Sequence, residues 1–461
     1  MTSSSATAAT STSPGRNQDH TSKSLTSVTR RTDLSLLYRV LRTLIRPFRP
    51  KLVEFPDPYP PGSPRIRKWP NNLYHVDITE RKLQISPSPD FPLPQVDPTT
   101  NTQALWIYDF ESKRLPKSKS NGENSGQSPR AGRSDSPSNQ KNPPSLTNAR
   151  SDSPDPNQQS RQKPKKWYTH TIYYFAGGGF QSPPSSEHWK FCCRLSRDLE
   201  NEQVRTVLIS YPLAPHSPAK DSLPLLRKWL VDELAEAAAH DGETITLMGD
   251  SAGGNVVLSL GFWWARRLQK MRQKEESGDL GVKKEIEALR RLRALFVMSP
   301  PCDFRNSNPH IDDADKLDPV LTRDLTDRAA EAWCKDWLSD PTNADPAVVD
   351  LRVEAEELER NGKRRVEADG KSDPALSPNL QTEEAWEALR QSGLVVTGVY
   401  GTADLLSPDV ELFMERCREE EIRGEWLVWE GQMHCFPLTV CYGLREGKEG
   451  FEWVKARLKE W

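Results

Sequence analysis

Ser251 lies between two glycines in residues 249–255, which read Gly-Asp-Ser-Ala-Gly-Gly-Asn. An apolar run at 244–248 precedes this segment, and the helix-like residues 256–268 follow it. A serine flanked by glycines where a strand turns into a helix is typical of a nucleophile elbow, which exposes the hydroxyl at the tip of a sheet. The alternative is a glycine-rich turn without a catalytic role, so the interpretation depends on partners elsewhere in the chain.

A serine hydroxyl is a weak nucleophile and needs an adjacent base, usually a histidine that a carboxylate holds in place. In hydrolases with such an elbow, the chain order is serine, acid, histidine. Asp404 follows the buried-strand pattern of residues 394–400, at a strand end where ligands gather in open α/β sheets. Asp409 is the nearby rival, but it is better interpreted as an N-terminal helix residue.

His434 is the candidate base, because it follows the strand-like residues 425–429. Of the eight histidines, it alone is both downstream of Asp404 and just past a strand end. His310, in a polar loop upstream of the acid, is the distant second candidate. Ser251, Asp404 and His434 therefore form the predicted catalytic triad.

Acyl transfer also needs hydrogen-bond donors for the oxyanion of the tetrahedral intermediate. Residues 176–180 read Ala-Gly-Gly-Gly-Phe and follow the strand-like residues 168–175. Consecutive glycines allow backbone N–H groups to converge on a small anion, and the N–H of Ala252 would complete the hole. A flexible loop without this role is the alternative.

Together, these motifs resemble the hormone-sensitive-lipase family of α/β-hydrolases. In that family a His-Gly-Gly-Gly loop precedes a Gly-Asp-Ser-Ala-Gly-Gly-Asn elbow, and a Tyr-x-Leu-Ala-Pro segment, matched here by residues 211–215, lies between them. Ser-Pro pairs at 299–300 and 377–378 are further matches. The resemblance is weak over 34–110 and good over 167–461. It implies the α/β-hydrolase fold, a mostly parallel central sheet flanked by helices, with a helical lid partly from the N-terminal segment.

The same resemblance implies a role for each matching residue. It makes Ser251 the nucleophile, Asp404 the orienting acid and His434 the general base. It makes the backbone N–H groups of Gly178, Gly179 and Ala252 the oxyanion donors. Asp250 would be structural rather than catalytic.

Two departures from the family pattern stand out. Ala176 replaces the loop histidine, and His216 replaces the acid that usually follows Leu-Ala-Pro. The loop histidine normally braces the glycine loop, so its loss predicts a softer oxyanion hole and slower turnover. Complete loss of one oxyanion donor costs about 10²–10³ in rate, and imperfect positioning should cost less.

Composition divides the chain into four parts. Residues 1–33 and 112–166 are rich in Ser, Pro and other polar types, and we expect them to be a disordered tail and a disordered insert. Residues 34–111 should form the lid helix and the first strands, and residues 167–461 the catalytic domain. The strand-like residues 104–110 and 168–175 should be neighbours, which makes the insert an enlarged hairpin loop. The insert is basic, and a solvated spacer is favoured over a phosphorylation-tuned arm for acidic partners.

Residues 34–50 combine an apolar helical face with arginines. The face consists of Leu37, Val40, Leu41, Leu44, Ile45 and Phe48. A lid helix over the active site is the favoured interpretation, and an amphipathic helix on an anionic membrane is the alternative. Both can hold together.

The remaining features limit the function class. The formal net charge of −2 argues against a nucleic-acid-binding protein, and no P-loop, dinucleotide fingerprint or metal-spaced Cys/His cluster is present. An acidic loop at 312–315 is better interpreted as solvated than as a calcium site. The seven cysteines show no disulfide framework, so reduced and mostly buried thiols are expected. Neither a secretory signal nor a transmembrane run is visible, which favours a cytoplasmic protein, with peripheral membrane contact through residues 34–50 as an option.

The sequence therefore predicts a serine carboxylic-ester hydrolase that uses no metal or cofactor and acts on a small-molecule or lipid ester. One alternative is an acetyl-ester, arylacetamide or sterol deacetylase with the same triad. An alternative of another class is a ligand-binding protein of the same fold without turnover. The sequence does not determine the oligomeric state.

Overall fold

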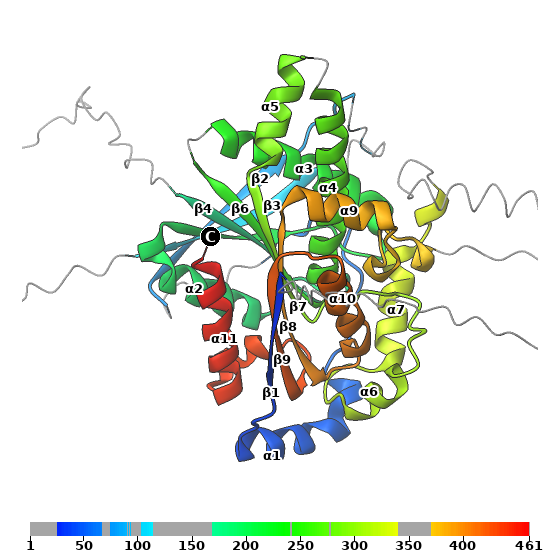
Figure 1. Cartoon of the computed structure of the whole chain (residues 1–461). Helices are drawn as coiled ribbons and strands as arrows, with labels where there is room; N and C mark the ends of the chain where they lie inside the picture. The colour runs from blue at the N-terminus through cyan, green and yellow to red at the C-terminus, as the bar shows by residue number, and fades with distance from the viewer. Residues whose placement is uncertain are drawn as a thin grey trace, which may run out of the picture.

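A nine-stranded sheet forms the centre of the molecule, with helices on both of its faces (Figure 1). The computed structural model describes residues 25–66, 74–89, 91, 93, 103–113, 168–239, 242–275, 278–339 and 370–460. The strand order is β1-β9-β8-β7-β6-β4-β5-β3-β2. Neighbouring strands are parallel except where β3 pairs with β2 and with β5. The predicted α/β class, a mostly parallel sheet flanked by helices, is confirmed.

The strands are β1 (Thr26–Arg31), β2 (Val76–Gln84), β3 (Ala104–Ser112), β4 (His170–Phe175), β5 (Val204–Ser210), β6 (Thr244–Asp250), β7 (Leu292–Met298), β8 (Val395–Ala403) and β9 (Gly424–Met433). The α-helices are α1 (Leu36–Ile45), α2 (Ser186–Asp198), α3 (Ala219–Ala239), α4 (Ser251–Lys274), α5 (Leu280–Leu289), α6 (Ile311–Leu317), α7 (Arg323–Cys334), α9 (Glu383–Ser392), α10 (Ser407–Glu419) and α11 (Arg445–Leu458). The 3₁₀ segments are η1 (Arg46–Lys51), η3 (Glu200–Glu202), η5 (Trp337–Ser339), η6 (Gly370–Ser372), η7 (Pro378–Leu380) and η8 (Phe436–Tyr442).

The central strands are buried on both faces, and their side chains alternate between two cores. In β4, Tyr173 and Phe175 belong to the core that α3, α4, α9 and α10 cover. Ile172 and Tyr174 point to the opposite core, which α2 and α11 cover. This alternation follows from the two-residue period of a strand, and it explains why β4 reads as a continuous apolar run.

The structure differs from the sequence expectation at the N-terminus. We expected residues 1–33 to be a disordered tail, but Thr26–Arg31 form β1 and pair in parallel with β9. Arg31 lies over the Trp429 ring at 3.7 Å, and Trp429 Nε1 donates to the carbonyl of Asp33 at 2.9 Å. The polar strand is held by backbone pairing and by β9 side chains, which a search for local apolar periodicity does not detect. Residues 1–24 lie outside the described residues.

The expected hairpin between β3 and β4 is wrong. β5 lies between them, pairing in parallel with β4 and antiparallel with β3. The physical reason is that β4 is bonded on both sides, to β5 and to β6, so no edge remains for β3. Most of the predicted insert, residues 114–166, lies outside the described residues, whereas Ser112 belongs to β3.

The N-terminal segment after β1 forms α1 and η1. The Ser35 hydroxyl accepts from the backbone N–H of Tyr38 and so caps α1. In Figure 1, α1 lies at the lower end of the view, below β1 and outside the layers that flank the sheet. Within the described part of the chain, no helix combines the length and apolar character needed to traverse a bilayer.

Candidate active site

The candidate acid and base follow two strands that end side by side. β8 and β9 are parallel neighbours, and Ala403 pairs with Met433 at their carboxyl ends. Asp404 directly follows the last residue of β8, and His434 directly follows the last residue of β9. The register of the sheet therefore brings together two residues that lie 30 positions apart.

The glycine loop and the candidate nucleophile are placed by a second pair of parallel strands. The last residues that pair between β4 and β6 are Phe175 and Gly249. The loop that begins at Ala176 and the turn at Ser251 therefore leave the sheet at the same edge. This edge is also where β8 and β9 end, because the strands between them run in the same direction. All the predicted site residues thus lie on one rim of the sheet.

Ser251 occupies the tight turn that its flanking glycines predict. Its φ is +48°, in the left-handed region that non-glycine residues seldom adopt. A Cβ atom on Gly249 would lie 2.4 Å from the Gly253 carbonyl oxygen, and one on Gly253 would lie 2.0 Å from that of Phe175. Only glycine fits at these two positions, because the backbone of the turn passes so close to neighbouring backbone. Ser251 is the first residue of α4.

Asp404 and His434 form a buried hydrogen-bonded pair. His434 Nδ1 lies 2.9 Å from Asp404 Oδ2. The other carboxylate oxygen accepts from the backbone N–H of Leu406 at 3.0 Å, and Asp404 is fully buried. Asp404 therefore holds the imidazole through Nδ1 and leaves Nε2 for chemistry on the cavity side.

The two rival residues lie elsewhere. Asp409 is in the first turn of α10 and accepts from Asn308 Nδ2 at 3.0 Å. Burial raises the pKa of Asp409 to about 6. Asp409 and His310 share a separate hollow of about 570 Å³ that none of the predicted triad residues lines.

The electrostatic surroundings of His434 favour its protonated form. Burial by itself would lower its pKa, but the Asp404 carboxylate and the neighbouring Cys435 together more than offset the burial. The pKa of His434 therefore lies well above its ordinary value of 6.5.

Cys435 is an unexpected neighbour of the imidazole. Its Sγ lies 3.4 Å from His434 Nε2, and its backbone N–H donates to Ser299 Oγ at 3.2 Å. Among the described residues, Ser251 Oγ makes no hydrogen bond, so the sulfur takes the contact that a resting triad would give to the serine. Cys435 also has a φ of +48°, a backbone conformation that suits glycine. All seven cysteines are free thiols, and all but Cys441 are buried, as expected.

The glycine loop lies directly against the nucleophile turn. The N–H of Gly177 donates to Asp250 Oδ1 at 3.0 Å. A Cβ atom on Gly177 would lie 2.5 Å from Asp250 Oδ2 and 2.8 Å from Ser251 Cβ. The first glycine is thus used for anchoring, and its lack of a side chain lets the loop approach Ser251.

The next two glycines keep their donors available. Gly178 and Gly179 have φ values of +132° and +57°, and within the described residues neither N–H donates a hydrogen bond. The N–H of Ala252 belongs to the first turn of α4, where helical N–H groups lack intrahelical acceptors. These three groups are the candidate oxyanion donors, and all three residues line the same cavity.

His188 on α2 braces the loop in the absence of a loop histidine. Its Nε2 lies 3.1 Å from Asp250 Oδ2, and the Tyr174 hydroxyl donates to Asp250 Oδ1 at 2.6 Å. Burial would raise the pKa of Asp250, but His188 and the hydrogen bonds hold it below its ordinary value. Ala176 is buried in the core, and its carbonyl accepts from the Tyr211 hydroxyl at 2.9 Å. The loop is therefore braced by other groups, while the predicted slow turnover stays a prediction.

A largely apolar cavity of about 220 Å³ lies in front of Ser251 and His434. Its apolar wall comes from the N-terminal segment, the glycine loop, the segment after β7, α7 and the turn before α10. The main contributors are Val53, Phe55, Phe180, Phe304, Leu325 and Leu406. Nowhere in the described part of the chain do three His, Cys, Asp or Glu side chains gather as a metal site would require.

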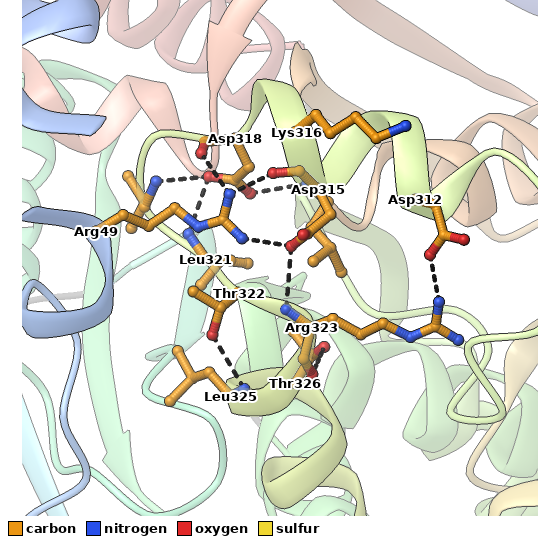
Figure 2. Close-up of polar contacts among 12 residues, drawn as sticks. Arg49, Asp312, Asp315, Lys316, Asp318, Leu321, Thr322, Arg323, Leu325 and Thr326 are labelled. Carbon is orange, nitrogen blue, oxygen red and sulfur yellow. Dashed lines mark hydrogen bonds and ion pairs between the residues drawn. The ribbon is translucent and has the colours of Figure 1, made fainter. Parts of the chain in front are cut away.

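A second buried carboxylate, Asp318, lies beside the pair. Its Oδ2 accepts from the N–H of Leu405, the residue after Asp404, at 2.8 Å. Burial, together with the charge of Asp404, raises the pKa of Asp318 to about 7. Figure 2 shows Arg49 of η1 reaching Asp315 and the Asp318 carbonyl, the latter at 3.2 Å. The N-terminal segment is thereby clamped to the chain that leads into α7.

The acidic residues at 312–315 pair with basic side chains. Asp312 contacts Arg323, Asp313 contacts Lys316, and Asp315 contacts Arg49 (Figure 2 labels all but Asp313). They lie on α6 rather than in a loop.

Sequence reasoning did not find His188 or Asp318. His188 follows Ser185 by three residues at the start of a helix, a spacing that signals a cap and gives no hint of Asp250. Asp318 has no local signal, because its neighbour Leu405 lies 87 positions away.

Comparisons with known proteins bear on the fold of the chain. Residues 172–361 match a family model described as alpha/beta hydrolase fold. A carboxyl esterase 2 from the mycorrhizal fungus Tuber melanosporum is 14% identical, with 93% of this chain and 99% of that chain covered and a TM-score of 0.54. An esterase/lipase from an uncultured bacterium is 14% identical over 93% and 99%, with a TM-score of 0.46. A hormone-sensitive lipase from a metagenome library is 18% identical over 64% and 78%, with a TM-score of 0.41. No curated protein matches the sequence.

The family match spans the glycine loop and the Ser251 turn and ends before Asp404 and His434. The structure supplies those two residues at the same sheet rim. The chain therefore has the α/β-hydrolase fold, as the resemblance predicted.

Proposed function

We propose that this protein is a serine carboxylic-ester hydrolase. The observation that carries the proposal is the Asp404–His434 hydrogen bond of 2.9 Å, made where His434, Ser251 and the glycine loop line one cavity. A carboxylate on Nδ1 fixes the tautomer in which Nε2 can accept a proton. The half-buried serine in a strained turn supplies the nucleophile.

The reaction would proceed in two halves. Ser251 Oγ attacks the acyl carbon while His434 Nε2 takes the hydroxyl proton, after exchanging its sulfur contact for the serine. The N–H groups of Gly178, Gly179 and Ala252 stabilise the oxyanion.

The leaving alcohol then takes the proton from His434, which leaves an acyl-serine. Water repeats the sequence, with its proton passing to His434 and then to Ser251 as the acid departs. Asp404 holds Nδ1 throughout and stabilises the imidazolium that forms.

The cavity favours a small apolar acyl group. Its volume of about 220 Å³ is below the range of about 300–1,000 Å³ that holds drug-sized ligands. The same observation favours a second candidate, an acetyl-ester or arylacetamide deacetylase, because the acetyl group is the smallest common acyl group. A panel of nitrophenyl esters from acetate to octanoate, with an acetylated arylamine, separates these possibilities.

Replacement of Ser251 by alanine tests the mechanism. We expect Ser251→Ala to lower kcat for nitrophenyl butyrate by at least about 10³-fold, as loss of a catalytic serine does elsewhere. A fluorophosphonate probe should label the wild type and leave the variant unlabelled.

Ser259→Ala is the matched control. Ser259 lies on the same helix, is buried, and its hydroxyl makes no hydrogen bond to a described residue. The proposal fails if Ser251→Ala keeps wild-type turnover. Absence of both labelling and turnover in the wild type would favour a ligand-binding protein.

A further inference from the structure

Two apolar stripes run along α1 and η1, and the fold covers only one of them. The inner stripe, Leu34, Tyr38, Leu41 and Ile45, packs against the core beneath α2 and α11. The outer stripe, Leu37, Val40, Leu44 and Phe48, is exposed by 66%, 48%, 63% and 62%. Both stripes have the three- and four-residue spacing of one helix face.

The exposure is concentrated in this segment. Six of the eleven exposed large hydrophobic residues of the described chain lie between Leu36 and Leu52. Single exposed hydrophobic residues are ordinary, but a contiguous patch marks an interaction surface. The outer stripe is such a patch, since its four members follow one another along the helix.

The charge of the segment indicates what covers the outer stripe. Residues 34–53 contain five cations and no acid. Arg42 and Arg46 donate to the backbone carbonyls of Gly431 and Lys316, which leaves their charges uncompensated by carboxylates. Arg49 alone among the five forms an ion pair in the described structure, with Asp315.

An apolar face on a cationic helix matches an anionic lipid surface. The apolar side chains can enter the boundary between headgroups and acyl chains, and the cations attract the anionic headgroups. A second copy of this chain is a poorer partner, because a two-fold interface brings the same patch of each copy together and so opposes cation to cation. With ten residues, α1 is also far shorter than the roughly 20 needed to span a bilayer.

The same segment is tied to the candidate active site. The Tyr38 hydroxyl accepts from the N–H of Met433, the residue before His434, at 2.8 Å. Beyond η1, Val53 and Phe55 form part of the cavity wall. The segment that carries the outer stripe is therefore continuous with the cavity wall.

We propose that the outer stripe docks α1 and η1 on an anionic lipid bilayer, which makes the protein a peripheral membrane protein. This inference concerns binding alone, and it stands or falls separately from the proposed esterase activity.

Vesicle flotation with the full chain tests the proposal. The wild type should float with vesicles of phosphatidylcholine and phosphatidylserine, and less well with phosphatidylcholine alone or at high salt. The double variant Leu37→Glu/Leu44→Glu should bind the anionic vesicles about tenfold or more weakly, because it removes apolar contacts and adds negative charge.

Leu280→Glu/Leu412→Glu is the matched control. These leucines are exposed by 66% and 56% and lie on α5 and α10, away from the outer stripe. The control should bind like the wild type, and both variants should keep the wild-type thermal midpoint and hydrolysis of a soluble acetate ester. The proposal is overturned if the wild type does not float with anionic vesicles, or if the stripe variant floats equally well. A dimer that the stripe variant dissociates, without vesicle binding by the wild type, would assign the stripe to self-association instead.

Discussion

The protonation state of one imidazole controls the proposed chemistry. A general base must be neutral to accept the serine proton, and its efficiency depends on a pKa near the working pH. The buried Asp404 holds His434 by Nδ1, and its charge raises the pKa of His434 although burial opposes this. Cys435 Sγ lies 3.4 Å from Nε2, the nitrogen that would serve Ser251.

We therefore expect an alkaline-shifted pH profile. Below its pKa, His434 is protonated and cannot accept a proton, so kcat/KM should rise with pH and reach half its maximum above pH 6.5. The measurement is hydrolysis of nitrophenyl butyrate between pH 5 and 9. In Asp404→Asn the half-maximum should move to lower pH, with kcat reduced by about 10⁴. A wild-type half-maximum at or below pH 6.5 would contradict this account.

At the scale of elements, helix α2 supplies the support that the glycine loop needs. It delivers His188 to Asp250, whose other oxygen holds the N–H of Gly177. His188 is thus a positioning residue that acts through Asp250 on the oxyanion donors. Replacement of the loop histidine by Ala176 leaves the loop anchored, because the anchor comes from a different element.

Removal of this support should slow turnover with little change in substrate binding. We expect His188→Ala to lower kcat about tenfold and to change KM little, which is less than the 10²–10³ lost with an oxyanion donor itself. His188→Gln, which keeps a donor for Asp250, should recover part of the rate. The measurement is kcat and KM of the wild type and both variants, under conditions where the same fraction of each protein is folded. If His188→Ala keeps wild-type kcat, the bracing role is wrong.

At the scale of the whole molecule, the first and last described strands pair at one edge of the sheet. β1 pairs with β9 over six residues, and the described sheet ends at β1 on this side. An uncovered β9 would present unpaired backbone groups to solvent and to other chains. The N-terminal strand thus protects the strand that leads into His434.

Deletion of residues 1–33 should therefore destabilise the protein. The ladder's hydrogen bonds contribute roughly 0.5–1.5 kcal/mol each, so the free energy of unfolding should fall by about 3 kcal/mol or more. Deletion of residues 1–24 removes none of the described contacts and is the control. Thermal unfolding and light scattering measure the effect. Equal midpoints for the two deletions would show that β1 does not matter to stability.

The sequence alone predicted the residues of the candidate site and the rim of the sheet on which they lie. Ser251, Asp404 and His434 each follow a buried strand, and the glycines around Ser251 and at 177–179 form motifs that can be recognised from adjacent residues. Such signals are local, since a strand's apolar run and the motif after it lie within a few residues.

Only the tertiary structure decided the contacts between distant segments. Examples are His188 on Asp250, Asp318 beside Asp404, β5 between β3 and β4, and the stripe of α1 left uncovered. Each of these contacts depends on which surfaces meet when the chain folds, and the residue spacing within one segment does not reveal its distant partners. The outer stripe shows this best: in the sequence its members share one helical face with Leu41 and Ile45, and only the finished fold separates the covered residues from the exposed ones.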